Sequence, residues 1–283
     1  MKLRHDAPPK GTVRDWVEAR ANAGGPAFVF PETGDRLDWP DLRDTARRIA
    51  GLLIAQGAQK GESVAIVMPN SRAAIEALYG TLIGGFRATM INLAAGRDAI
   101  AYALDHSGAR FAFVDDSARD LFNAAAKGLP VTRLDPAKAP PSPDALPALA
   151  PSDHALLMYT SGTTGRPKGV VHTHASLLAG GWTTSVAHAL GPDDRGLCVL
   201  PIYHINGLCV SVMGSLVSGG SLALCSRFSA SRFWGWADDA QRIKDGARVP
   251  EGFVYASDSN VAWMSDTELQ SWINANRDFI GKI

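Results

Sequence analysis

The feature that most constrains the fold of this chain is an alternation of short apolar runs with longer amphipathic segments. Residues 63–68 are nearly all apolar, as expected for a strand that is covered on both faces. Residues 88–91 and 110–114 also have strand character, and residues 98–106 between them have a helical pattern. Strands joined through helices favour parallel pairing, so the sequence predicts an α/β domain with a largely parallel sheet.

Two further helices are predicted from apolar spacing and from the residues at their ends. The segment from Pro40 to Gln56 begins with a proline, which is favourable at a first helical position, and Gly57 follows where a C′ glycine is expected. Its apolar residues fall on one face: Leu42, Ala46, Ile49, Ala50 and Leu53. A helix over 72–83 is expected to have Asn70 as its N-cap.

A proline-rich stretch divides the pattern. Residues 135–152 contain six prolines and predict a semi-rigid surface connector rather than part of a core. After it we expect a strand over 154–160, a glycine-rich turn, a helix from about Thr173, a strand over 197–200 and an apolar segment that ends at 222–225. The α/β alternation therefore continues beyond the connector.

The composition excludes several classes of protein. Lys plus Arg number 28 and Asp plus Glu number 28, so the formal net charge is zero and no nucleic-acid partner is expected. The N-terminal residues lack the apolar stretch of a secretory signal, and three cysteines fit neither a disulfide framework nor a zinc knuckle. We therefore expect a cytoplasmic protein with buried, reduced thiols.

Residues 196–226 carry no charged side chain, but Pro201 and Gly219–Gly220 interrupt them, and no membrane span is expected.

Residues 159–170 hold the groups that point most directly to chemistry. After an apolar strand they contain three glycines, four Ser or Thr hydroxyls and Lys168. Glycines let backbone N–H groups turn toward an anion, hydroxyls donate further hydrogen bonds, and the lysine adds a positive charge. A cation about 4 Å from a phosphate oxygen gains roughly 4 kcal/mol at an effective dielectric of about 20, before desolvation. The segment therefore predicts a loop that binds a polyphosphate.

Two other interpretations of this segment fit less well. A Walker A loop has the pattern G-x-x-x-x-G-K-[ST], whereas here Gly165 is followed by Arg166-Pro167-Lys168 and then by Gly169. Pro167 also lacks the N–H that a helix-start cradle would use. A flexible surface loop rich in Ser, Thr and Gly would explain a scattered composition, but it explains this ordered string poorly.

The run from Thr160 to Val170 matches the pattern [ST]-S-G-T-T-G-x-P-K-G-V without a gap. It resembles the phosphate-binding signature of the adenylate-forming superfamily, which includes the acyl-CoA synthetases. Residues 200–208 resemble the "PLFHxxGL" segment of acyl-CoA synthetases. Three earlier segments resemble the superfamily in the same order: 37–42, 60–66 and 82–88. The resemblance covers roughly residues 10–236 and implies the N-terminal portion of the adenylate-forming fold, incomplete, with layered, mostly parallel sheets flanked by helices.

The resemblance implies ATP-dependent activation of a small-molecule carboxylic acid to an acyl-adenylate, followed by thioester formation with coenzyme A. ATP, Mg²⁺ and coenzyme A are the implied cofactors, although no obvious carboxylate cluster for the metal is present. Carried over by position, the residues that would hold the ATP phosphates are Thr160, Ser161, Gly162, Thr163, Thr164, Gly165 and Lys168. Lys168 and Thr163 are the implied catalytic residues.

Several other side chains carry weaker functional signals. His204 would lie near the acyl or adenylate pocket by resemblance, although a histidine in an apolar segment is more often a core residue. His172 and His174 are expected to be partly exposed residues at a helix start. Tyr203 and Trp182 are expected to pack rather than to contact substrate.

Later motifs of the superfamily are not found in this sequence, among them Y-G-x-T-E, T-G-D and the lysine of a C-terminal domain. Such groups position the reactants, a contribution of about 7–11 kcal/mol. We therefore expect a family-like domain over 1–236 and a tail over 237–283 without the resemblance, with a strand over 253–256 and a helix opened by a capping box at 265–268.

Two hypotheses stay open. The chain is either an acid–thiol ligase of the acyl-CoA synthetase type, or a catalytically incomplete remnant or partner subunit that at most binds nucleotide. An incomplete sheet is also expected to expose apolar surface and to favour self-association.

Overall fold

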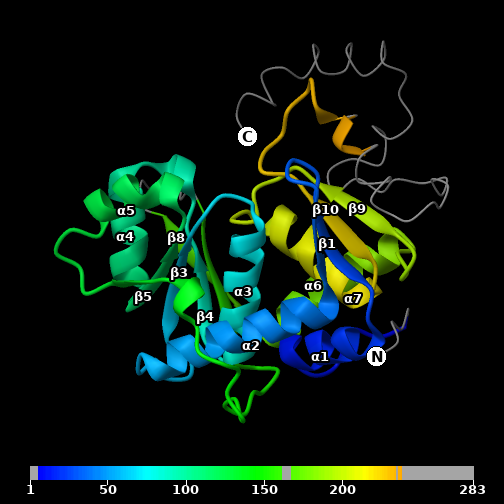
Figure 1. Cartoon of the computed structure of the whole chain (residues 1–283), viewed down its shortest axis with the longest axis horizontal. Helices are drawn as coiled ribbons and strands as arrows, with labels where there is room; N and C mark the ends of the chain where they lie inside the picture. The colour runs from blue at the N-terminus through cyan, green and yellow to red at the C-terminus, as the bar shows by residue number, and fades with distance from the viewer. Residues whose placement is uncertain (1–5, 161–166, 234, 238–283) are drawn as a thin grey trace.

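The computed structural model describes residues 6–160, 167–233 and 235–237. Two β-sheets lie side by side with helix α3 (Arg72–Gly84) between them (Figure 1). The strands are β1 (Pro26–Phe30), β2 (Asp35–Asp38), β3 (Ser63–Val67), β4 (Arg87–Met90), β5 (Phe111–Val114), β6 (Thr132–Leu134), β7 (His154–Thr160), β8 (Lys168–Thr173), β9 (Arg195–Cys198) and β10 (Ser221–Leu224). The other α-helices are α1 (Val13–Ala23), α2 (Trp39–Ala55), α4 (Arg97–Ser107), α5 (Arg119–Ala125), α6 (His174–Ala187) and α7 (Met213–Ser218). Short 3₁₀ turns are η1 (Leu93–Ala95), η2 (Asp116–Ala118) and η3 (Pro136–Lys138), and η4 (Asn206–Val212) is a π-helix.

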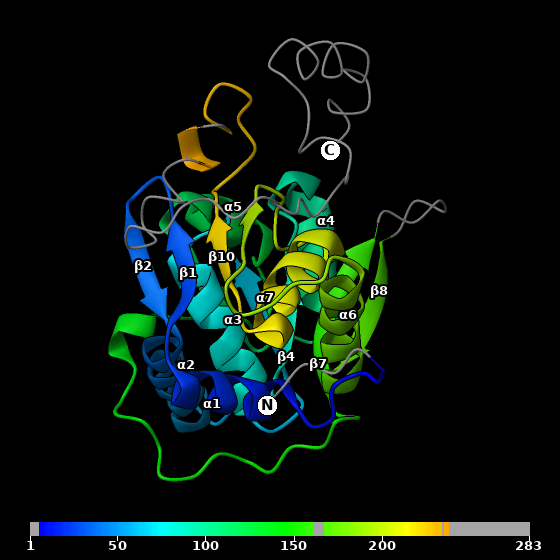
Figure 2. The ribbon, with the colours of Figure 1, turned by 90° about the vertical axis from the view of Figure 1, so that its right-hand side faces the viewer.

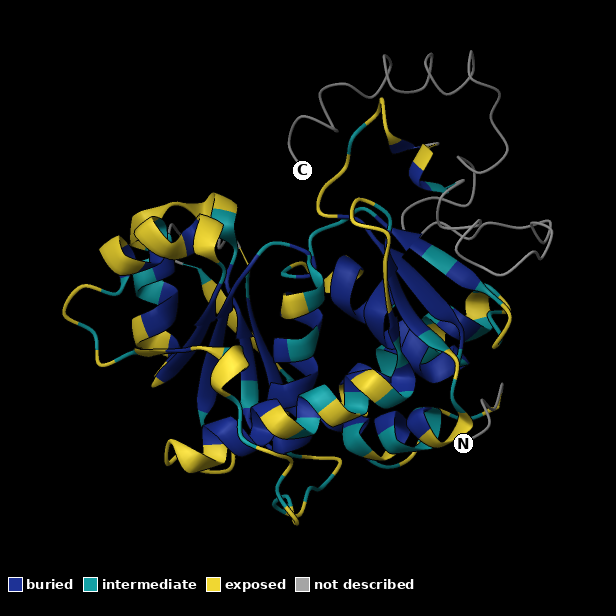
Figure 3. Ribbon diagram, viewed as in Figure 1, coloured by how far each residue is buried: buried dark blue, intermediate teal, exposed yellow. Residues whose placement is uncertain are grey.

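The larger sheet has the strand order β6-β5-β3-β4-β7-β8. It is parallel except between β7 and β8, which are antiparallel. Every residue of β3 is buried, because α2 and α3 cover one face of the sheet while α4 and α5 cover the other (Figures 1 and 3). The strands predicted over 63–68, 88–91 and 110–114 and the helix predicted over 98–106 are confirmed. The predicted α/β class is therefore correct.

The smaller sheet has the strand order β2-β1-β10-β9. Its central strands β1 and β10 are parallel, with Phe28 opposite Leu222, although they come from opposite ends of the described sequence. β9 pairs with β10 in parallel, and β2 closes the other edge as an antiparallel partner of β1. The strand expected over 197–200 corresponds to β9, which lies two residues earlier, and the apolar segment expected to end at 222–225 contains β10.

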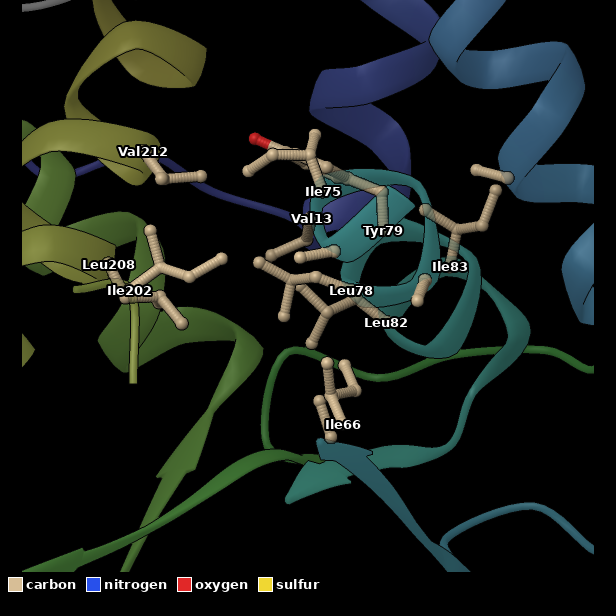
Figure 4. Close-up of a cluster of buried hydrophobic side chains, with 14 of the residues drawn as sticks. Val13, Ile66, Ile75, Leu78, Tyr79, Leu82, Ile83, Ile202, Leu208 and Val212 are labelled. Atoms are coloured by element: carbon tan, nitrogen blue, oxygen red, sulfur yellow. The ribbon is translucent and has the colours of Figure 1, made fainter. Parts of the chain in front are cut away.

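The main hydrophobic core is built around α3. Side chains of this helix, Leu78 among them, meet Ile66 of β3 and also Leu208 and Val212 of η4 (Figure 4). The packing of α3 against α2 is tight, since a Cβ placed on Gly80 would lie 2.5 Å from Cγ2 of Ile49. A residue without a side chain is therefore required at this crossing.

The predicted helix over 40–56 is confirmed as α2, and its predicted apolar face is buried. Gly57 has a φ of 82°, which suits a glycine that ends a helix. The N-cap of α3 is Ser71, whose hydroxyl accepts a 3.1 Å hydrogen bond from the N–H of Ala74. The prediction of Asn70 as this N-cap is therefore wrong by one residue, and Asn70 has a different role.

The proline-rich segment 135–152 passes along the outside of α2 and then past the C-terminal end of α3 (Figure 2). Arg14 donates to the carbonyl of Pro147 at 2.8 Å and to that of Ile83 in α3 at 2.7 Å. Leu146 packs against the main core. The segment is thus a connector that contacts the helices that it passes.

The uncharged segment 196–226 belongs to β9, η4, α7 and β10, and none of the helices within the described ranges is long and apolar enough to cross a membrane. Cys198, Cys209 and Cys225 are buried free thiols, as expected. Among the exposed large apolar side chains are Val170 and Val171 on the edge strand β8. Self-association through such surface stays a prediction.

Candidate functional site

The β7–β8 hairpin flanks the predicted phosphate-binding loop. Thr160, the last residue of β7, pairs in register with Lys168, the first residue of β8, and both residues are exposed. The loop residues themselves lie outside the described part of the chain: Ser161, Gly162, Thr163, Thr164 and Gly165. The structure therefore places the two ends of the predicted site, Thr160 and Lys168, opposite each other.

The connection after the loop differs from that of a P-loop, in which a helix follows directly. Here β8 comes first, and α6 begins only at His174. Thr173 caps α6 through a reciprocal capping box with Ser176, so the predicted helix start is confirmed. Strand β8 was not predicted, and its presence agrees with the argument from spacing against a Walker A loop.

The hairpin ends lie at the carboxyl edge of the larger sheet. β3, β4 and β7 are parallel neighbours, so the ends of these strands, Thr160 included, share one edge. In open α/β sheets, ligands bind outside the carboxyl ends of the strands. The position of the hairpin therefore fits a ligand-binding role.

Asn70, just after β3, joins this edge to the smaller sheet. Its side chain is buried, and its Nδ2 donates to the carbonyls of Leu200 at 2.8 Å and Cys225 at 2.9 Å. Its Oδ1 accepts a 2.8 Å hydrogen bond from the N–H of Ile202. Sequence reasoning missed this role, although the place of Asn70 at the carboxyl end of a buried strand was a usable signal.

His204 lies in the β9–η4 connection (residues 199–205) that Asn70 holds. Its N–H donates to the carbonyl of Pro201 at 3.0 Å, and its exposed ring lies 4.9 Å from that of Tyr203. Desolvation by neighbouring groups lowers the pKa of His204, which favours a neutral imidazole that can donate or accept a hydrogen bond. The ring is thus accessible, and the alternative of a buried core histidine does not hold.

The π-helix η4 follows His204 closely. A Cβ placed on Gly207 would lie 2.5 Å from the carbonyl oxygen of Pro201, so η4 packs directly against the β9–η4 connection. Single π-helical turns occur frequently at functional sites. Asn70 lies at the same carboxyl edge as Thr160 and holds the connection that carries His204. His204 and the hairpin ends therefore lie on one side of the molecule.

The expectation of two partly exposed histidines at a helix start is correct only in part, since His174 begins α6 but is buried, whereas His172 is partly exposed but lies in β8. His174 is only 1% exposed, and its Nδ1 accepts a 3.4 Å hydrogen bond from the N–H of Val13 in α1. Burial lowers the pKa of His174 to about 4. His172 is half-buried in β8, while Tyr203 and Trp182 pack against the main core as expected.

Within the described ranges, no three His, Cys, Asp or Glu side chains converge as metal ligands would. Mg²⁺ usually binds through one or two carboxylates together with substrate phosphates rather than in an all-protein cage.

The two-sheet fold with this hairpin at its carboxyl edge is that of the N-terminal domain of adenylate-forming enzymes. The sequence profile of the family described as AMP-binding enzyme matches residues 16–253. The chain therefore belongs to the AMP-binding enzyme family.

Relatives with named activities are CoA ligases. The sulfoacetate–CoA ligase of Cupriavidus necator is 39% identical over 221 residues, which cover 74% of this chain and 43% of that protein. The long-chain-fatty-acid–CoA ligase FadD13 of Mycobacterium tuberculosis is 31% identical over 237 residues, which cover 79% of this chain and 46% of that protein. A crystal structure of the N-terminal domain of FACL13 from Mycobacterium tuberculosis superposes with a TM-score of 0.70 at 26% identity, covering 80% of this chain and 60% of that one. The chain thus spans a little less than half the length of these curated relatives.

Proposed function

We propose that this chain supplies the triphosphate-binding part of an ATP-dependent acid–CoA ligase. In the first step a carboxylate oxygen attacks the α-phosphorus of ATP and pyrophosphate leaves, which forms an acyl-adenylate. In the second step the thiol sulfur of coenzyme A attacks the acyl carbon and AMP leaves. The observation that carries the proposal is the run from Thr160 to Val170, in which Thr160 and Lys168 form a register pair at the carboxyl edge of the larger sheet.

The chemistry of this run suits the first step. Negative charge develops on the leaving pyrophosphate, so donors directed at the β- and γ-phosphates lower the barrier. Lys168 would contribute a cation there, with Thr160 and Thr163 as hydroxyl donors beside backbone N–H groups. Mg²⁺ would enter as part of the MgATP substrate. His204, neutral and exposed on the same side, would contact the acyl or adenylate group.

ATP–pyrophosphate exchange tests this proposal. The purified chain is assayed with a panel of carboxylic acids that includes sulfoacetate and long-chain fatty acids, because the relatives are named for such different acids. Exchange that depends on one of these acids and on Lys168 is the expected result.

Binding of MgATP gives a second measurement that does not require turnover. Lys168→Ala removes one charge-assisted interaction and should weaken binding by about 10- to 100-fold. Lys127→Ala, at an exposed lysine just after α5, is the matched control and should bind as the wild type does. Equal affinities for wild type and Lys168→Ala would overturn the proposed phosphate site.

The two hypotheses from the sequence give different results in these assays. Binding that depends on Lys168 without exchange for any acid would support the catalytically incomplete remnant or partner subunit. Exchange together with binding would support the ligase.

A further inference from the structure

A hydrogen-bonded aromatic cluster lies directly beside the hairpin ends. The hydroxyl of Tyr159 is 2.9 Å from Nδ1 of His106 and donates to the carbonyl of Ala103 at 3.3 Å. The His106 ring stacks on Tyr102 with centroids 5.2 Å apart and an interplanar angle of 24°. Tyr102 also meets Tyr159 edge-on at 6.3 Å. Helix α4, which carries Tyr102 and His106, is thus attached to the end of β7.

This cluster is next to both ends of the candidate site. Tyr159 immediately precedes Thr160, and its register partner Gly169 immediately follows Lys168. A Cβ placed on Gly169 would lie 3.5 Å from Cε1 of Tyr159 and 3.8 Å from Cε1 of His106. The two rings therefore pack over the residue that adjoins Lys168.

The hydrogen-bonding roles follow from the number of protons available. Burial, with Tyr102 as a further cause, raises the pKa of Tyr159 to about 12, so the phenol keeps its single proton at neutral pH. Because the phenol O–H donates to the carbonyl of Ala103, the phenol oxygen accepts a hydrogen bond from Nδ1–H of His106. The pair then bridges the backbone of α4 to the hairpin through two consecutive hydrogen bonds.

We infer that His106 and Tyr159 are positioning residues that hold Thr160 and Lys168 in the arrangement that binds a polyphosphate. β8 is an edge strand, hydrogen-bonded to β7 alone among the strands of the sheet, and the packing of the two rings at Gly169 is a second attachment for its first residues. The aromatic pair supplies that attachment from α4. This inference rests on the proposed function, because it assigns the pair a role through Lys168.

The test measures dissociation constants for MgATP and for inorganic tripolyphosphate by calorimetry, in parallel with thermal melting. Tyr159→Phe keeps the ring and removes both hydrogen bonds. His106→Phe keeps the stacking on Tyr102 and removes the donor. Each variant should bind both ligands about 3- to 10-fold more weakly, as expected for the loss of the His106–Tyr159 hydrogen bond that both substitutions remove. The double variant should bind no more weakly than the weaker single variant, because both substitutions remove the same bridge.

Two controls separate positioning from stability. His106→Asn restores a donor near the position of Nδ1 and should recover most of the lost affinity. Tyr102→Phe leaves the His106–Tyr159 hydrogen bond and the stacked rings in place and should bind as the wild type does. A Tyr159→Phe protein that melts at a lower temperature yet binds both ligands normally would overturn the inference, since the pair would then act on stability alone.

The outcomes also distinguish this inference from the function on which it rests. Normal binding by Tyr159→Phe and His106→Phe, with weak binding by Lys168→Ala, would overturn the inference and leave the phosphate site standing. A wild-type chain that binds neither MgATP nor tripolyphosphate would overturn both.

Discussion

Asn70 accepts a hydrogen bond from the backbone N–H of Ile202 across 132 positions of sequence. The same carboxamide donates to two carbonyls that follow β9 and β10, so a single side chain links the carboxyl edges of both sheets. Ile202 is two residues from His204, and the position of this candidate substrate residue is therefore set by an amide at the end of β3.

Asn70→Asp should destabilise the fold strongly. The new carboxylate would face the carbonyls of Leu200 and Cys225, leaving that of Cys225 without a donor and that of Leu200 with only the Cys198 thiol at 3.4 Å. The lost hydrogen bonds and the carboxylate facing carbonyl oxygens should cost about 2–5 kcal/mol of the free energy of unfolding, which urea denaturation can measure. The control is Asn92→Asp, because Oδ1 of Asn92 accepts from Ala94 N–H at an exposed turn and aspartate can do the same. Similar urea midpoints for the two variants would contradict this account.

His174 should make stability depend on pH below neutrality. Its pKa is about 4 in the folded chain and 6.5 in the ordinary unperturbed state. As pH falls from about 6.5 to 4, the unfolded chain takes up a proton that the folded chain does not, so stability is lost over this window, by up to about 3 kcal/mol.

His174→Asn tests this dependence, since asparagine offers an acceptor to the N–H of Val13 without titrating. The free energy of unfolding is measured between pH 7 and pH 4 for both proteins, and the difference between the two curves isolates the contribution of His174. Parallel curves would show that this imidazole does not couple protonation to folding.

Gly207→Ala should destabilise the start of η4. The added methyl would lie 2.5 Å from the carbonyl oxygen of Pro201, which is a backbone atom and cannot rotate away. We expect a loss of about 1–3 kcal/mol in the free energy of unfolding. In Gly214→Ala the methyl meets Cγ2 of Thr184 at an ordinary 3.8 Å, so that variant should gain up to about 1 kcal/mol from helix propensity. Chemical denaturation of the pair gives the comparison, and equal stabilities would refute the steric argument.

Tyr79→Phe should stabilise the chain. Tyr79 is fully buried against Phe28 and Trp39, and its hydroxyl has no hydrogen-bond partner among the described residues. Removing a buried unsatisfied hydroxyl while keeping the ring should raise the free energy of unfolding by about 1 kcal/mol. Tyr159→Phe is the opposite case, because it removes two hydrogen bonds, and should lower the melting temperature by about 2–4 °C. A less stable Tyr79→Phe protein would indicate a bound water or another partner at that hydroxyl.

The parts of the fold that could be predicted from sequence are those with a strong local pattern. The apolar run of β3 and the one-sided burial of α2 are properties of a few consecutive residues, and both were predicted correctly. β8 was missed because its six residues, Lys-Gly-Val-Val-His-Thr, include a glycine and show no clean alternation, and their strand conformation depends on pairing with β7.

The site could be predicted only where residue order itself carries the signal. The motif that ends at Val170 is contiguous, so its glycines, hydroxyls and lysine are enough to indicate phosphate binding. Asn70 and His106 form hydrogen bonds with groups that lie 53 to 155 positions away in the sequence. The spacing of apolar and polar residues within one helix or strand does not indicate such contacts. The burial of His174 has the same origin, since its partner Val13 is 161 positions distant.

The pairing of β1 with β10 has a consequence for how the protein is made. Phe28 of β1 emerges from the ribosome long before its neighbour Leu222, and the roughly 190 residues between them take about 10–40 s to synthesise. Through that interval the apolar strand β1 has only β2 as a partner, while the strands of the larger sheet, which lie between residues 63 and 173, are translated and can pair with one another. Chaperone dependence during translation should therefore centre on the β1–β2 hairpin.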